Sequence, residues 1–378
     1  MHPHYALCLV AMLLVACRSS VPEAPQSPEV QQAEPAPPLP LPAVYDLLLD
    51  GKLDATSLAS LVDHSERRRA ETGPWRQQIR VARSADGLDF ELLDLPPVLD
   101  RAAVPEAVVG PAGRTWLFFV DGDLDSMLAN ARKGSTQHLT RGIPSLGALD
   151  LAVSDDGLHF ERVPEFEIRG LTRGMVVDPE VIRLSDGRWR MYYVGMALVE
   201  YFTMATWQPG ERHEVFFAES DDLIHWQQKG RALRGPYADP TVLCHGDDRC
   251  LMISFGLDHA VSADGGATFS YQGSWGPPGF APDISRRGPD ELRLYYNDKA
   301  AGAPIRSMRS SDSGDWTPEP GERLPDTYAE APTAIPQPDG SVLMYFHTFA
   351  DPADLPGTEQ ATPGTTEHQA YKPDKRPE

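Results

Sequence analysis

One phrase that occurs five times constrains the fold of this chain more than any other feature. It consists of a small or acidic residue, a proline, a short apolar run, a polar turn and a second apolar run rich in aromatic residues. The five copies begin at Val104, Val177, Ala238, Ala281 and Glu330. A unit that returns at intervals of roughly 40 to 75 residues indicates a radially repeated architecture.

A second phrase alternates with the first. Ser-x-Asp-Gly or a close variant, followed by an aromatic residue, starts at Ser84, Ser154, Ser220, Ser262 and Ser310. This composition is typical of a tight turn between two strands. Four strands in each of five units predict an all-β fold, the five-bladed β-propeller. A β-sandwich with coincidental turns is the alternative.

The order of the two phrases predicts how the ring closes. The first turn phrase precedes the first proline phrase, and the copy that begins at Glu330 has no complete partner after it. The strands near residues 80–93 are therefore expected to complete the last blade. Such closure removes the open sheet edges that an incomplete ring would expose.

The ends of the chain predict its location. Residues 7–16 form an apolar stretch too short to cross a membrane, and Cys17 follows it. This looks like a bacterial lipoprotein signal with Cys17 as the lipidated residue, although no Lys or Arg precedes the apolar stretch. We expect an exported protein at the outer membrane, the cell surface or in the periplasm, held to the membrane through the lipid anchor only. A buried helix is the alternative for residues 7–16.

The rest of the chain divides by composition. Residues 18–43 are rich in Pro, Ala, Glu, Gln and Ser and are expected to form a tether. Leucine spacing predicts a short helical extension over 44–78, and the propeller is expected over 79–350. The tail 351–378 is rich in Pro, Thr and Glu and is expected to be disordered.

Cysteine usage predicts a disulfide, and the net charge limits the class of binding partner. Cys244 and Cys250 flank a turn and are expected to face each other across a hairpin, where an oxidising compartment would join them in a disulfide. A metal site with His245 as a third ligand is the alternative. The formal net charge of −21 argues against nucleic acid as a partner. We expect a monomer.

The proline phrases place acids at the centre of the ring. In a propeller the first strand of each blade lines the central channel, and side chains alternate along a strand. The residues on either side of each proline should therefore share the channel face: Val104 and Glu106, Asp178 and Glu180, Asp239 and Thr241, Ala281 and Asp283, and Ala331 and Thr333. Like charges in a confined site raise some carboxyl pKa values, so that a neutral acid and an ionised base can coexist. Glycoside hydrolysis requires that pair. Strand capping and cation binding are the alternative roles.

Two long connections are expected on the rim of the channel mouth, at residues 121–149 and 196–213. Long loops on a rigid scaffold are usually functional or disordered. Tyr201 and Trp207 in the second loop offer flat faces that could stack on a sugar ring. Packing within the loop is their alternative role.

Over about residues 79–350 the chain resembles glycoside hydrolase family 43, the five-bladed propellers that include arabinanases, xylosidases and arabinofuranosidases, with the related invertases and levansucrases. Three segments carry the resemblance to the family's Asp-Pro strands and its Glu-Gly-Pro segment: Asp178-Pro179-Glu180, Asp239-Pro240-Thr241 and Glu330-Ala331-Pro332. By this resemblance Asp178 would be the base, Asp239 would tune the acid and Glu330 would be the acid. The family carries its acids on consecutive blades from the first, whereas here the first blade has Val104 and Glu330 lies one blade later.

The resemblance also implies carbohydrate as the partner and no required cofactor. A structural calcium ion in the axial channel is compatible with the acids there. The expected substrate contacts beyond the three acids are Glu106, Glu180, Asp283, Tyr201 and Trp207.

Two other functions fit parts of the sequence. The segment from Ser262 to Phe269 resembles the Asp-box of sialidases, which have six blades. A surface-anchored propeller that binds glycans or acts as a scaffold without turnover is the other alternative, because the first blade lacks the family's aspartate.

Overall fold

The computed structural model describes ten segments of the chain, which are residues 73–122, 149–171, 175–196, 214–235, 237–246, 248–275, 279–288, 291–299, 303–311 and 314–351. The predicted signal, the tether, most of the helical extension and nearly all of the tail lie outside these residues. The same holds for Cys17, Tyr201 and Trp207. Within the described segments no helix is long and apolar enough to cross a lipid bilayer.

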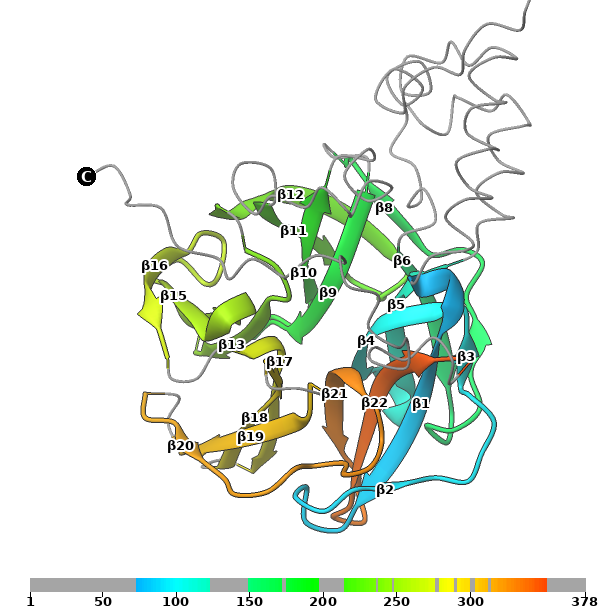
Figure 1. Ribbon diagram of the computed structural model, residues 1–378. Helices are drawn as coiled ribbons and strands as arrows, with labels where there is room; N and C mark the ends of the chain where they lie inside the picture. Colours follow the sequence, from blue (N-terminus) through cyan, green and yellow to red (C-terminus); the bar gives the residue numbers. More distant parts are fainter. Residues whose placement is uncertain are drawn as a thin grey trace, which may run out of the picture. The chain divides into compact units, whose positions relative to one another are not determined.

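Five sheets surround a common axis (Figure 1). The chain is a five-bladed β-propeller. Blade 1 comprises β4 (Ala102–Val109), β5 (Thr115–Asp121), β6 (Leu149–Ser154) and β7 (Glu161–Arg162). Blade 2 comprises β9 (Met175–Arg183), β10 (Trp189–Met196), β11 (Glu214–Ser220) and β12 (His225–Arg234), with β8 (Glu167–Arg169) parallel to β12. Blade 3 comprises β13 (Thr241–His245), β14 (Arg249–Ser254), β15 (Asp258–Ser262) and β16 (Ser270–Ser274). Blade 4 comprises β17 (Gly279–Gly288), β18 (Glu291–Asp298), β19 (Ile305–Ser310) and β20 (Thr317–Pro318). Short 3-10 turns are η1 (Pro74–Arg76), η2 (Pro111–Gly113) and η4 (Phe255–Leu257).

The last blade joins the two ends of the ring, as predicted. It comprises β21 (Glu330–Pro336), β22 (Val342–Phe349), β1 (Gln77–Ser84) and β2 (Glu91–Leu92), and β3 (Leu99–Asp100) also pairs with β1. β1 pairs with β22 without interruption from Gln77 opposite Phe349 to Ser84 opposite Val342. β1 thus begins two residues inside the range predicted for the helical extension. Five blades do not match the six that the sialidase alternative requires.

The position of a strand within its blade explains its composition. β5, the second strand of blade 1, is buried at every residue, because the faces of the blade pack against the two neighbouring blades. The outermost strands β2, β7 and β20 are exposed at both of their residues, and Leu92 is the one large apolar residue among these six. The apolar aromatic runs of the sequence therefore mark the second strands.

The Ser-x-Asp-Gly phrases that start at Ser84, Ser154, Ser220 and Ser262 form tight turns, as predicted, and these turns connect the third and fourth strands of their blades. Part of the copy that starts at Ser310 lies outside the described residues. In the turn of blade 1 the Ser154 hydroxyl donates to Asp156 and accepts from the backbone N–H of Gly157. The Tyr345 hydroxyl of blade 5 donates to the carbonyl of the same Gly157, 2.8 Å away. Tyr192 and Tyr295 make the same contact with the turns of blades 3 and 5. These turns hold neighbouring blades together.

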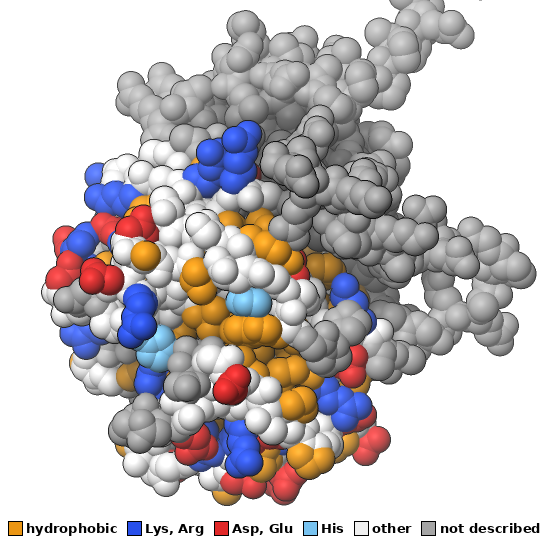
Figure 2. Space-filling model, turned by 90° about the vertical axis from the view of Figure 1, so that its left-hand side faces the viewer, with side chains coloured by type: hydrophobic (Ala, Val, Ile, Leu, Met, Phe, Trp, Pro, Cys, Tyr) orange, Lys and Arg blue, Asp and Glu red, His pale blue; other side chains and the backbone are white. Residues whose placement is uncertain are grey.

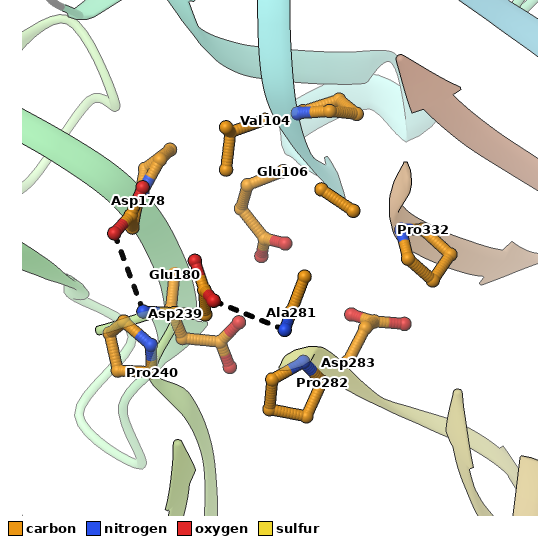
Figure 3. Close-up of a pocket in the computed structure, with 13 residues that line it drawn as sticks. Val104, Glu106, Asp178, Glu180, Asp239, Pro240, Ala281, Pro282, Asp283 and Pro332 are labelled. Atoms are coloured by element: carbon orange, nitrogen blue, oxygen red, sulfur yellow. Dashed lines mark hydrogen bonds between the residues drawn. The ribbon is translucent and has the colours of Figure 1, made fainter. Parts of the chain in front are cut away.

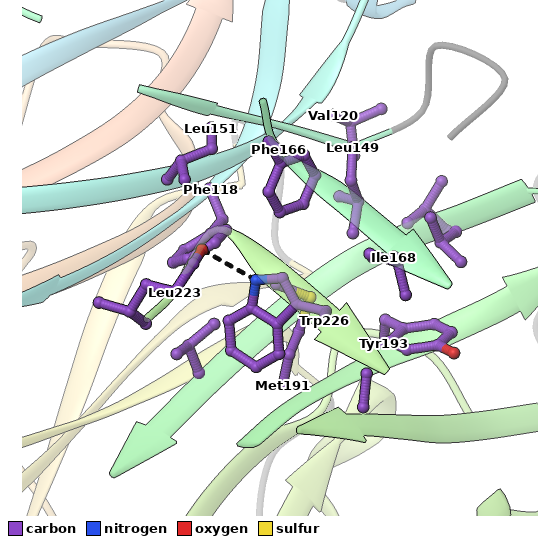
Figure 4. Packing of buried hydrophobic residues seen from close by; sticks show 14 of the residues in the cluster. Phe118, Val120, Leu149, Leu151, Phe166, Ile168, Met191, Tyr193, Leu223 and Trp226 are labelled. Carbon is purple, nitrogen blue, oxygen red and sulfur yellow. Dashed lines mark hydrogen bonds between the residues drawn. The ribbon is translucent and has the colours of Figure 1, made fainter. Parts of the chain in front are cut away.

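Aromatic side chains fill the space between blades 1 and 2 (Figure 4). Trp226 is 1% exposed and meets Phe118 edge to face, with 5.9 Å between ring centroids. Its indole N–H donates to the carbonyl of Leu223 at 2.9 Å. Burial of such side chains contributes roughly 1.5–3 kcal/mol each and makes the ring a rigid support for its central channel.

A disulfide joins Cys244 and Cys250, which are direct partners across the β13–β14 hairpin. Neither sulfur is then free for the alternative metal site with His245. On the outer side of the molecule, toward blades 3 and 4, hydrophobic side chains gather in the middle of the view with charged ones around them (Figure 2). In these blades His259 stacks on Trp275 with 4.1 Å between ring centroids.

Candidate functional site

The five proline phrases meet at the channel and line a depression (Figure 3). We call the five first strands around it the hub. The depression has a cavity volume of about 30 Å³, which is room for roughly two water molecules or an ion, and it opens to solvent. The lining residues are Val104, Pro105, Glu106, Asp178, Pro179, Glu180, Asp239, Pro240, Ala281, Pro282, Asp283, Ala331 and Pro332.

The residues before the prolines form the mouth ring, and all five have left-handed backbone angles. Their φ values are Val104 46°, Asp178 53°, Asp239 48°, Ala281 45° and Ala331 50°. Such angles are uncommon outside glycine, above all for a β-branched residue such as Val104. In blade 1 the ladder runs from Ala103 opposite Val120 to Glu106 opposite Phe118, so one extra residue is inserted. The residues on both sides of the proline line the depression in blades 1, 2 and 4, as predicted. The strands do not alternate simply, however, because a bulge accompanies the residue before the proline.

The residues after the prolines form the inner ring, which closes through hydrogen bonds from blade to blade. Each side chain accepts a backbone N–H from the next blade. The five bonds are Val181 N to Glu106 at 3.1 Å, Val242 N to Glu180 at 2.7 Å, Ile284 N to Thr241 at 3.0 Å, Ala334 N to Asp283 at 3.0 Å and Ala107 N to Thr333 at 3.1 Å. Glu106, Glu180 and Asp283, predicted as substrate contacts, thus line the depression and also connect the blades.

The three inner-ring acids are close together. One oxygen from each of Glu106, Glu180 and Asp283 lies within 4.8 Å of the others. Burial raises the pKa of Glu106 and Glu180 well above the usual value, and the neighbouring carboxyls raise both further. Burial also raises the pKa of Asp283 to about 7. Protons or a cation would relieve the repulsion, and the predicted calcium ion remains a prediction.

Asp178 and Asp239 are neighbours in the mouth ring. An Asp178 carboxylate oxygen accepts the backbone N–H of Asp239 at 3.4 Å, and an Asp239 oxygen accepts that of Ala281 at 3.1 Å. Burial, and next the charge of Asp239, hold the pKa of Asp178 well above its usual value. Burial raises the pKa of Asp239 to about 6 despite the hydrogen bond from Ala281. The pair therefore favours holding one proton between its two carboxyls.

Glu330, the third predicted acid, begins β21 beside the depression and is not among its lining residues. The Tyr328 hydroxyl donates to one of its oxygens, and His347 Nε2 lies 3.3 Å from the other. These contacts outweigh burial, so the pKa of Glu330 is lowered. The negative charge of Glu330 contributes to the raised pKa of Asp239, so Glu330 interacts electrostatically with the aspartate pair.

The sequence analysis missed three residues that contact the hub strands: Tyr328, His347 and Asn297. The Asn297 side chain is fully buried and accepts the backbone N–H of Ala331, as His347 accepts that of Val104 in the next blade. Both follow a pair of aromatic residues at the end of a second strand. That shared spacing was the signal that could have found them.

No family model matches the sequence, and no curated protein matches it. Solved structures similar to this chain include glycoside hydrolases. The family 43 protein BlXynB of Bacillus licheniformis is 11% identical with a TM-score of 0.47, and the match covers 67% of this chain and 50% of that one. An α-L-arabinofuranosidase of Lactobacillus brevis is 13% identical with a TM-score of 0.45, covering 65% and 82%. A family 117 glycoside hydrolase of the marine bacterium Zobellia galactanivorans is 12% identical with a TM-score of 0.43, covering 73% and 91%. Likenesses of this size carry no conclusion about the activity of this chain.

Proposed function

We propose that this protein is a glycoside hydrolase that acts on an oligosaccharide or polysaccharide at the hub. The observation that carries the proposal is the contrast between the surroundings of the hub carboxyls. Asp178 and Asp239 lie next to each other, whereas Glu330 has Tyr328 and His347 at its two oxygens. The pKa values of Asp178 and Asp239 are raised, whereas that of Glu330 is lowered. Environments that drive carboxyl pKa values apart are how one site holds an acid and a base near neutral pH.

This pair of states is what cleavage of a glycosidic bond needs. A neutral carboxyl protonates the leaving oxygen, while an ionised carboxylate activates water or attacks the anomeric carbon. Asp178, Asp239 and Glu330 are the three acids proposed to carry this chemistry. The inner-ring acids Glu106, Glu180 and Asp283, which line the depression, are proposed to contact the sugar. Tyr201 and Trp207, which lie outside the described residues, are proposed as further substrate contacts.

The test is sugar release from a panel of plant and bacterial oligosaccharides and aryl glycosides. Wild type is compared with Asp178→Asn, Glu330→Gln and, as a matched control, Asp339→Asn in an exposed turn. We expect release by wild type and the control, and losses of roughly 10²–10⁴-fold in the two hub variants. No release by wild type across the panel would reject the proposal.

A non-catalytic glycan-binding or scaffold propeller is the second candidate. It is favoured by the inner ring, where all three carboxyls already accept hydrogen bonds that join blades, and by the apolar Val104 at the first-blade position. Calorimetry with the same oligosaccharides separates the two candidates. Binding without turnover, unchanged in Asp178→Asn, would support this second function.

We propose further that the protein is an exported, monomeric lipoprotein anchored through Cys17. The support is the sequence pattern at residues 7–17. Labelled palmitate should enter the wild-type protein in a bacterial host and not a Cys17→Ser variant. Equal labelling of both would reject the anchor.

A further inference from the structure

Glu330 is the hub carboxyl with a side-chain donor on each oxygen. It lies opposite His347 in the β21–β22 pair. Tyr328, two residues before it, donates its hydroxyl to Oε1, and His347 Nε2 faces Oε2 at 3.3 Å. A carboxylate has about four lone-pair sites, so each oxygen can still accept a hydrogen from water.

The contacts of His347 fix which of its nitrogens carries the hydrogen. Nδ1 lies 3.2 Å from the backbone N–H of Val104 and must accept it. Nε2, which faces Glu330, is therefore the nitrogen that carries a hydrogen. The side chain is 6% exposed, so water does not compete for these bonds. His347 thus connects Val104, the mouth-ring residue of blade 1, to Glu330.

The aspartate pair has the opposite surroundings. The hydrogen bonds that Asp178 and Asp239 accept come from backbone N–H groups at 3.4 and 3.1 Å, and the two carboxyls face each other. Two donors stabilise a charged carboxylate, whereas a second carboxyl favours a shared proton. The resemblance-based roles, with Asp178 as base and Glu330 as acid, conflict with this arrangement.

We propose, resting on the proposed glycosidase function, that Tyr328 and His347 are positioning residues that hold Glu330 as the general base. The proton for the leaving group then comes from the Asp178–Asp239 pair. In the step, a water oxygen forms a bond to the anomeric carbon while one water proton moves to Glu330. The bond from that carbon to the glycosidic oxygen breaks, its electron pair stays on the oxygen, and the oxygen takes the proton of the aspartate pair. Solvent returns the proton from Glu330 to the pair.

A series of aryl glycosides of the released sugar, from dinitrophenyl to phenyl, tests the assignment. The Glu330→Gln variant should hydrolyse every member of the series roughly 10²–10⁴-fold more slowly than wild type, because base catalysis is needed for each leaving group. Asp178→Asn should slow hydrolysis as much for the phenyl glycoside and much less for the dinitrophenyl glycoside, whose leaving group needs no proton. The reverse pattern would overturn the inference.

A carboxyl titration by NMR tests, without relying on turnover, whether Tyr328 and His347 keep Glu330 ionised. With ¹³C-labelled Glu, the signal absent from Glu330→Gln identifies Glu330, and it should titrate below the ordinary value of about 4.3. Tyr328→Phe and His347→Gln should each raise that pKa by roughly one unit, and move the acidic limb of the activity profile equally. Tyr296→Phe, a buried tyrosine in the core between blades 3 and 4, is the control.

The outcomes separate the two hypotheses. Turnover with a Glu330 that titrates above its ordinary value, or that Tyr328→Phe does not shift, would overturn the inference alone. If the protein shows no turnover and the pKa of Glu330 is low, the proposed function and the base role of Glu330 are both rejected. The stabilisation of ionised Glu330 by Tyr328 and His347 would still be supported. Tyr328→Phe keeps the test decisive if the buried His347→Gln variant fails to fold.

Discussion

At the scale of single residues, the mouth ring links protonation to stability. Asp239 has a pKa raised to about 6, so between about pH 4 and 6 the folded state binds more protons than the unfolded chain. Unfolding then becomes easier as the pH rises through this window, by up to about 1.4 kcal/mol per pH unit. Asp239→Asn keeps an oxygen for the Ala281 N–H and cannot ionise. We expect it to flatten this dependence in urea unfolding measured from pH 4 to 8. A variant with the same pH slope as wild type would contradict the raised pKa.

At the scale of elements, the inner ring is a circle of bonds between first strands. Thr241 is fully buried, accepts the Ile284 N–H at 3.0 Å and donates to Glu180 at 3.3 Å. Thr241→Val keeps the shape and leaves the Ile284 N–H unpaired, which should cost about 1–3 kcal/mol. Urea unfolding checks this against Thr317→Val on the exposed strand β20. Equal costs for the two variants would show that the circle adds nothing to stability.

The elements also show what the sequence could predict. The proline phrase repeats at one position of each blade, so the lining of the depression, the number of blades and the closure by β1 followed from it. The bulge could not be predicted from the sequence, since no local propensity favours left-handed backbone angles at Val104 or Ala331 before a proline. The partners of Glu330 could not be predicted either, because His347 reaches it only across the β21–β22 pair and is fixed by a bond to blade 1.

At the scale of the whole molecule, closure by β1 makes the ring one cooperative unit. Ile79 of β1 is fully buried in a cluster shared by blades 5 and 1. Ile79→Ala should cost about 2–5 kcal/mol. Because a closed ring has no free edge from which one blade can open, amide hydrogen exchange should speed up by at least ~30-fold in β14 of blade 3 as well as in β22. Leu92→Ala, at a 37% exposed position of β2 in the same blade, should change neither. Faster exchange confined to β21 and β22 would mean that the blades open one at a time, and that the hub is only as rigid as the strands beside each acid.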